Sequence, residues 1–367
     1  MKLIYLIFIS FCFSQTHIHP DSIEQRIFFL GDAGTHIPEN GFMPNLVALK
    51  SELHKNPSKN LLLILGDNIY PAGLPPEEDE SYETYRRILQ AQIDISTETG
   101  VKTYMIPGNH GWNKYSEGGW DYIIRMQRYV DGHGKGIIEF YPKDGTPGPV
   151  IKEFGSFKFI LMDTHWFLHQ YEKPFQERET IVTDSIFTSL EKLIQTTKDK
   201  HVIIAAHHPI RTNGVHGGYF NLQDHLFPLT RLSKYAWVPL PLIGSIYPIA
   251  RNLGASEQDV SGTKYSRLIT RFNDLLDKVT PLAIVGGHEH NLQVLEHKNT
   301  LQLISGSGRA DHITSIDGSE NMLYGVEEAG FIVLNKLKNK QIVLEVWISD
   351  KNGRASLVYQ NEVKVSN

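Results

Sequence analysis

LLLILGDNIYPAG, residues 61–73, is an apolar run that ends at an aspartate, an asparagine and a tyrosine. Such a run, bounded by a glycine, predicts a short strand that is covered on both faces of its sheet. Because α/β proteins usually place their sites at the carboxyl ends of such strands, Asp67 is the first candidate functional residue. Gly, Asp and Asn also favour turns for local backbone reasons, so this stretch alone leaves a simple turn as the alternative.

The same pattern recurs elsewhere in the chain. Other apolar runs end at Asp32, at Asn109 and His110, at His207 and His208, and at His288 and His290. Chance rarely aligns metal-ligand residue types with the ends of so many strand-like runs. The set offers oxygen and imidazole donors but no thiolate, and this mixture suits iron, zinc or manganese.

The first residues of the chain predict an export signal. Residues 1–13 contain one Lys and are otherwise almost wholly apolar, and a polar segment follows Ser14. This pattern is typical of a secretory signal peptide, here residues 1–14, cleaved near Ser14. The run is shorter than the roughly 20 residues that a membrane-spanning helix needs. We therefore expect a secreted or periplasmic protein, whose mature form lacks the only cysteine, Cys12.

The composition is that of an ordinary soluble globular protein. The 367 residues are 41% hydrophobic and carry a formal net charge of −5. The mild acidity and the lack of a basic run argue against a nucleic-acid partner. Because the candidate ligands extend from Asp32 to His290, we expect one catalytic domain over residues 22–367. We expect this domain to act as a monomer.

Helical patterns lie between the strand-like runs. Apolar residues share one helical face in residues 186–194 and 265–279, and weaker patterns cover residues 42–55, 82–95 and 120–130. Alternating strands and helices predict an α/β layered fold. Towards the end of the chain, short strand-like runs replace the helices, at residues 301–304, 330–334, 341–348 and 357–365. We expect these closing runs to complete a second sheet, so that two mixed sheets pack together with helices outside.

Two stretches resemble insertions. Residues 131–149 are rich in Gly, Pro and Lys and predict a surface loop. Residues 235–250 carry no charge and contain three prolines, within a candidate lid or surface insertion at residues 231–262. A buried loop or lid over the helices is the simpler interpretation of residues 235–250. The alternative is an exposed apolar patch for a membrane surface or a partner.

Taken together, the motifs resemble those of the calcineurin-like metallophosphoesterases. They are Gly31-Asp32-x-Gly34, Gly66-Asp67-Asn68-x-Tyr70, Gly108-Asn109-His110, Ala206-His207 and Gly287-His288-x-His290. Tyr70, three residues after Asp67, makes the chain similar to the purple acid phosphatase branch, particularly its small tartrate-resistant type. The resemblance covers roughly residues 26–310. It implies a four-layer αββα sandwich in which two mixed sheets are flanked by helices.

The resemblance also implies a site for two metal ions. The bridging carboxylate of the family corresponds to Asp67. The first ion would take Asp32, Tyr70 and His290 as further ligands, and the second Asn109, His207 and His288. A phenolate with two carboxylates favours Fe(III), with a phenolate-to-iron colour, whereas the more neutral second set suits a divalent Fe, Zn or Mn ion.

His110 and His216 are the candidate catalytic histidines. By resemblance, His110 binds the phosphoryl oxygens or protonates the leaving group, and His216, nine residues after His207, faces the substrate with Asn109. The family commonly has an acidic residue after the Asn-His pair, but Gly111 stands there, which puts the orientation of His110 in question.

Two neighbouring polar residues are expected to lie outside the ligand set. We expect His208 to lie behind the metal ligands rather than among them, because neighbouring residues at a strand end point in different directions. By resemblance, Asp163 is a structural carboxylate that supports the site.

The implied reaction is direct attack of a metal-bound hydroxide on a phosphate monoester at acidic pH, without a covalent enzyme intermediate. The expected substrate is a phosphorylated small molecule or a phosphoprotein. A phosphodiesterase or nucleotide hydrolase on the same fold is one alternative. A protein that only binds phosphate or iron is another, and a structural protein with a relic site is the third.

Overall fold

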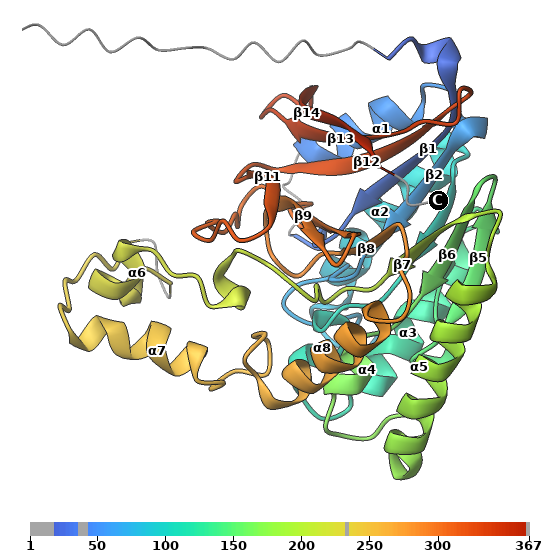
Figure 1. Ribbon diagram of the computed structural model, residues 1–367. Coiled ribbons are helices and arrows are strands. Elements are labelled where there is room, and N and C mark those ends of the chain that lie inside the picture. Colours follow the sequence, from blue (N-terminus) through green and yellow to red (C-terminus); the bar gives the residue numbers. More distant parts are fainter. Residues whose placement is uncertain (1–17, 36–42, 232–234, 365–367) are drawn as a thin grey trace, which may run out of the picture.

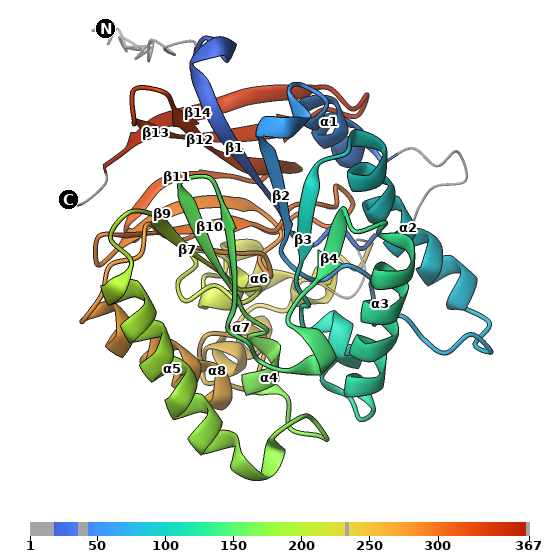
Figure 2. The same cartoon turned by 90° about the vertical axis from the view of Figure 1, so that its right-hand side faces the viewer.

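The computed structural model describes residues 18–35, 43–231 and 235–364, and shows two seven-stranded sheets packed face to face (Figures 1 and 2). The first sheet has the order β14-β13-β12-β1-β2-β3-β4. Its strands are β1 (Ile23–Leu30), β2 (Asn60–Ile64), β3 (Lys102–Met105), β4 (Ile138–Phe140), β12 (Gly330–Leu337), β13 (Ile342–Ser349) and β14 (Ala355–Val363).

The second sheet has the order β11-β9-β10-β8-β7-β6-β5. Its strands are β5 (Val150–Phe154), β6 (Phe157–Leu161), β7 (His201–Ala205), β8 (Ala283–Gly286), β9 (Leu292–His297), β10 (Thr300–Ser305) and β11 (Met322–Val326). Parallel pairs β1–β2–β3 in the first sheet and β6–β7–β8 in the second form the centre of the fold, and antiparallel strands extend both sheets.

Helices cover the outer face of each sheet, as Figure 2 shows. Beside the first sheet lie α1 (Pro44–Leu53), α2 (Tyr82–Thr99) and α3 (Gly119–His133). Beside the second lie α4 (His165–Leu168), α5 (Glu179–Thr196) and α8 (Thr263–Leu276). Two short helices, α6 (Leu222–Leu226) and α7 (Ile246–Asn252), lie to one side of the sandwich (Figure 1). The predicted four-layer αββα architecture is therefore confirmed, and each predicted helix is present.

Continuous apolar runs are needed because the central strands are covered on both faces. On β1, Phe29 belongs to the core between the sheets, whereas its neighbour Phe28 packs in the outer core under the helices. On β2, Leu63 belongs to the core between the sheets and Leu62 packs in the outer core under the helices. Because successive side chains of a strand point to opposite faces, a polar residue at any of these positions would be buried in one core or the other.

The expected pairing of the closing strands is wrong in part. β12 pairs antiparallel with β1, so that β12, β13 and β14 extend the first sheet, and of the four predicted closing runs only β10 joins the second. All eight residues of β12 are buried, which fits a strand beside the fully covered β1. Periodicity predicts that a strand exists but not its partner, because the pairing of β1 with β12 joins residues far apart in sequence.

Both predicted insertions differ from the expectation. Residues 131–149 are not a loop throughout, because β4 pairs parallel with β3 at the edge of the first sheet. Residues 235–250 do not form a buried loop. Their side chains include Trp237, which is 56% exposed, Ile246, which is 62% exposed, and Leu242, which is 89% exposed.

The predicted signal peptide, residues 1–14, lies outside the described residues. Within the described ranges, no helix is long and apolar enough to cross a membrane.

The inter-sheet core gives a stability prediction. Leu63→Ala should lower the free energy of unfolding by about 3 kcal/mol, because the 1% exposed side chain would leave a cavity between the two sheets. Denaturant unfolding of the metal-loaded protein measures this change. Leu242→Ala, at the 89% exposed position, is the matched control and should change stability by less than about 0.5 kcal/mol. Equal effects of the two substitutions would contradict the assignment of the core.

Candidate metal centre

The two sheets contribute the candidate ligands from the carboxyl ends of their central strands. The first sheet supplies Asp32 after β1, Asp67 and Tyr70 after β2, and Asn109 after β3. The second supplies His207 after β7 and His288 and His290 after β8. Because the strands within each central set are parallel, their carboxyl ends lie at one edge, and the structure brings all seven predicted metal ligands together there.

One group of donors surrounds the hydroxyl of Tyr70. This oxygen lies 2.7 Å from Asp32 Oδ1, 3.1 Å from Asp67 Oδ2 and 2.9 Å from His290 Nε2. His290 Nε2 is also 3.4 Å from Asp32 Oδ1. These are the donors that the sequence assigns to the first ion.

The second group surrounds the amide oxygen of Asn109. Asn109 Oδ1 lies 3.0 Å from His207 Nε2 and 3.1 Å from His288 Nδ1. Asp67 Oδ2 is 3.4 Å from His207 Nε2, so the same carboxylate oxygen contacts members of both groups. Asp67 therefore lies where a bridging ligand is expected.

Backbone carbonyls hold the outer nitrogen of each candidate ligand histidine. His207 Nδ1 lies 2.8 Å from Leu65 O, His288 Nε2 lies 2.7 Å from Gln258 O, and His290 Nδ1 lies 3.0 Å from His312 O. Each carbonyl oxygen accepts from the N–H of the outer nitrogen, so the other nitrogen of each ring faces the centre and offers its lone pair there once it is deprotonated. Metal-ligating histidines are usually oriented in this way.

The backbone at the site adopts conformations that are otherwise uncommon. Asp32, Asp67 and His288 have φ angles of 58°, 51° and 71°, in the left-handed region. Such strain persists where the surroundings over-determine it and clusters at functional sites. The turns also approach closely: a Cβ at Gly108 would lie 2.3 Å from Asp67 Oδ1, and one at Gly287 would lie 2.1 Å from Asp32 Oδ2.

The buried ionisable groups of the site shift one another's pKa values. Burial by itself raises the pKa of Asp67, yet the neighbouring His207 and His110 hold it well below the usual range. Burial lowers the pKa of His207, but Asp67 outweighs this and raises it to about 9. Burial together with Asp32 and Asp67 raises the pKa of Tyr70 well above its usual value. A bound cation would replace the proton on His207 and favour the phenolate of Tyr70, so the donors fit a metal centre.

His110 faces the same edge, despite Gly111. Its backbone N–H donates to Asp67 Oδ1 at 2.9 Å, and its ring lies against that of Tyr70, with centroids 4.3 Å apart. His110 Nδ1 lies 2.5 Å from Pro71 O, which leaves Nε2 on the side of Asp67, 3.8 Å from Oδ2. Contacts with the segment that follows Asp67 therefore fix the ring.

The loop after His110 is anchored from the second sheet by Asp163. Asp163 is fully buried and accepts a 2.7 Å hydrogen bond from Trp112 Nε1. Its other carboxylate oxygen accepts from the backbone N–H groups of His165 and Trp166. These contacts hold the loop that follows His110, as expected of a carboxylate that supports the site.

His216 also reaches the centre. Its ring lies against that of His288, with centroids 4.2 Å apart. Its backbone N–H donates to Glu289 Oε1 at 2.6 Å, and its Nδ1 lies 3.0 Å from Asp259 Oδ1. The structure thus brings together every residue that the sequence singled out as catalytic, metal-binding or substrate-binding.

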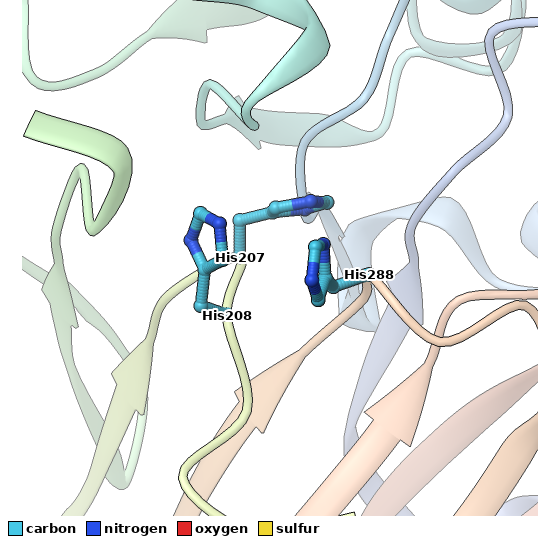
Figure 3. Close-up of side chains that lie close together, drawn as sticks. All are labelled: His207, His208 and His288. Carbon is cyan, nitrogen blue, oxygen red and sulfur yellow. The ribbon is translucent and has the colours of Figure 1, made fainter. Parts of the chain in front are cut away.

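His208 lies nearer to the donors than we expected. His207, His208 and His288 lie side by side and could hold a cation with ligand atoms within 4.8 Å of one another (Figure 3). His208 Nδ1 lies 2.9 Å from Thr164 Oγ1, and no described residue bonds its Nε2. Asp32, Asp67 and His207 form a second such group, which is the one that includes the shared carboxylate.

Sequence reasoning missed the contribution of the insertion. Gln258 and Asp259, from the segment between α7 and α8, contact His288 and His216. No local pattern marks these two residues, because they follow no strand and resemble ordinary loop polarity. Glu289 Oε1 accepts from the backbone N–H of His216. The sequence did not single out Glu289, although it lies between His288 and His290.

Comparisons with known proteins agree with this geometry. The calcineurin-like phosphoesterase family matches residues 25–292. Purple acid phosphatase 17 of Arabidopsis thaliana is 23% identical over 231 residues, which span 59% of this chain and 62% of that protein. The matched region therefore covers less than two thirds of this relative.

Two solved structures share the fold. GAP50, described as the anchor in the inner membrane complex of Plasmodium, has a TM-score of 0.58 and 16% identity, over 94% of this chain and 90% of that chain. Purple acid phosphatase PPD1 from seeds of yellow lupin, Lupinus luteus, has a TM-score of 0.53 and 13% identity, over 92% of this chain and 53% of that chain.

The resemblance inferred from the motifs is thus confirmed by sequence and by fold. The family match includes all the candidate ligands from Asp32 to His290. Purple acid phosphatases are among the relatives on both comparisons. The chain belongs to the calcineurin-like phosphoesterase family.

Proposed function

We propose that the protein is a metal-dependent hydrolase of phosphate monoesters that uses two metal ions. The observation that carries this proposal is the arrangement of seven donors in two groups that share Asp67 Oδ2. Two ions held in this way would neutralise the charge of a phosphate ester and would lower the pKa of water. Membership of the phosphoesterase family supports the same reaction class.

The residues around the ions supply the remaining chemistry. His110 Nε2 and His216 Nε2 are the ring nitrogens that Pro71 O and Asp259 leave available. Each can donate a hydrogen bond to a phosphoryl oxygen or a proton to the departing oxygen. Asn109, in the second group, contributes its amide to the same surface.

We propose Fe(III) for the group of Asp32, Tyr70 and His290, because a phenolate with carboxylates is a hard, anionic set. The group of Asn109, His207 and His288 is more neutral and suits divalent Fe, Zn or Mn. The physiological substrate class that we propose is a phosphorylated small molecule or a phosphoprotein, met outside the cytoplasm after removal of residues 1–14.

A phosphodiesterase or nucleotide hydrolase is the second candidate. Gln258 and Asp259 bring the insertion against His288 and His216, so this segment forms one wall of the site and can shape a pocket for a second substituent. A protein that only binds phosphate or iron would keep the metal-binding donors but would not hydrolyse a phosphate ester.

A comparison of two esters tests the reaction. Purified mature protein with its native metals should hydrolyse an aryl phosphate monoester faster than the corresponding diester, with higher activity at acidic pH. A preference for the diester would favour the second candidate. Failure on both esters, with two ions bound, would favour a binding role.

Asp67→Asn tests the shared carboxylate. Because the amide cannot supply an anionic oxygen to both groups, turnover should fall by more than the roughly 10–100-fold that loss of an outer partner of a ligand costs. Steady-state kinetics and metal analysis of the same sample measure this. Asp79→Asn, at an exposed position, is the matched control and should retain wild-type turnover. Wild-type turnover of Asp67→Asn would refute the shared-carboxylate mechanism.

Alanine at the two histidines tests the proton donors. His110→Ala and His216→Ala should each lower kcat by roughly 10²–10⁴-fold where proton transfer limits turnover, without loss of bound metal. Unchanged turnover in both variants would remove these histidines from the mechanism.

We also propose that residues 235–250 contact a membrane surface. The segment has no charge, exposes Trp237, Leu242 and Ile246, and lies beside the sandwich rather than within it (Figure 1). Exposed apolar patches rimmed by polar residues often mark such contacts.

Vesicle flotation tests the membrane contact. The mature protein should float with phosphatidylcholine vesicles, and Leu242→Ser with Ile246→Ser should weaken partitioning at least about tenfold, because two apolar side chains no longer enter the bilayer. Leu323→Ser, at another exposed leucine, is the control. Absence of wild-type flotation would remove the proposal and leave the hydrolase assignment untouched.

A further inference from the structure

Asp259 is a buried carboxylate that no predicted role explains. It lies between α7 and α8, and its side chain is 2% exposed. Its Oδ1 lies 3.0 Å from Nδ1 of His216. A buried carboxylate is costly unless it is paired, so the fold must maintain this contact by other interactions.

Arg251, near the end of α7, fixes the carboxylate of Asp259. Its guanidinium donates to both carboxylate oxygens, which is the bidentate geometry of a strong ion pair. Arg251 Nη1 also donates to Tyr247 Oη at 2.6 Å, one turn earlier on the same helix. Arg251 Nη2 donates to Oδ1, the oxygen that also faces His216, and lies 3.4 Å from His216 Nδ1. The carboxylate therefore has little freedom to rotate.

His216 is held at three points. Its Nδ1 faces Asp259, its backbone N–H donates to Glu289 Oε1 at 2.6 Å, and its ring lies against His288 with a centroid separation of 4.2 Å. Because a carboxylate oxygen can only accept a hydrogen bond, the ring nitrogen that faces Asp259, Nδ1, carries a proton and donates to it. Nε2 is then the one ring nitrogen left for a substrate.

The segment that carries Asp259 also orients a candidate metal ligand. Gln258 O lies 2.7 Å from His288 Nε2. Two consecutive residues of the insertion thus contact the rings of His288 and His216, so one short piece of backbone orients both rings.

We propose that Asp259, clamped by Arg251, is a positioning residue that holds His216 so that Nε2–H is aimed at the leaving-group oxygen. This inference rests on the proposed hydrolase function. The oxygen of the attacking water bonds to phosphorus as the bond between phosphorus and the leaving oxygen breaks. The leaving oxygen keeps the electrons of that bond and takes the Nε2 proton of His216, whose ring carries a proton on both nitrogens before the step. His216 becomes neutral with Nδ1–H still on Asp259, and solvent restores the proton.

A dependence on the leaving group separates this role from a structural one. A poor leaving group needs the proton, whereas a good one departs without it. Asp259→Asn should therefore lower kcat for phenyl phosphate about a hundredfold and leave kcat for dinitrophenyl phosphate within about threefold of wild type. KM for both substrates and the metal content should change little.

Two further variants complete the test. Glu257→Gln, at a neighbouring carboxylate of the same segment, is the matched control and should behave as wild type with both substrates. In a double-mutant cycle, Asp259→Asn added to His216→Ala should have no further effect on kcat, because the two residues act as a unit. The cycle compares folded, metal-loaded proteins. If Asp259→Asn does not fold, the double variant Arg251→Met/Asp259→Leu replaces both members of the buried ion pair with apolar side chains, so that neither charge is left unpaired. This double variant should show the same dependence of kcat on the leaving group as Asp259→Asn.

The outcomes are distinguishable. Equal loss with both substrates, or an Asp259→Asn effect that persists in full beside His216→Ala, would overturn the positioning role while leaving the hydrolase assignment in place. A wild-type protein that cleaves neither ester would instead overturn the proposed function itself.

Discussion

Two buried carboxylates, Asp32 and Asp67, meet at the edge where the two sheets come together, and the rest of the site follows from the need to compensate their charge. Both side chains have almost no exposure to solvent. Unpaired anions in such surroundings are strongly unfavourable. In the protein alone, the proton on His207 and the hydroxyl of Tyr70 share this task, at the cost of pKa values displaced far from their usual ranges.

A pair of cations would also compensate these carboxylates. The inner nitrogens of the ligand histidines already face the centre, because backbone carbonyls occupy their outer nitrogens. The left-handed backbone at Asp32, Asp67 and His288 shows that the turns adopt uncommon conformations to present these donors. The energetic cost of assembling the centre is thus linked to the binding of the ions.

Much of this could be predicted from sequence because the fold makes the relevant signals local. Each ligand follows an apolar run, so strand and donor lie within a few residues of each other, as with Leu65 and Asp67. The pairing of β12 with β1 could not be predicted in this way, since it joins distant residues. The roles of Gln258 and Asp259 could not be predicted for the same reason. Their partners are His288 and His216, which are distant in sequence and adjacent only in the folded chain.

The insertion therefore has two different sides. Its outer side exposes Leu242 and Ile246, whereas its inner side fixes His216 through Asp259 and Arg251. Arg251 and Ile246 lie on the same short helix, α7, so this helix carries both an exposed apolar side chain and the guanidinium that holds Asp259.

The number and type of bound metal ions test the central claim most directly. We predict two ions per chain, one of them Fe(III), with a visible phenolate-to-iron absorption that disappears in Tyr70→Phe while the second ion remains. Elemental analysis and absorption spectroscopy of the same sample measure both quantities. A protein saturated with a single ion, or an absorption that survives in Tyr70→Phe, would contradict the assignment of these donors to a two-metal centre.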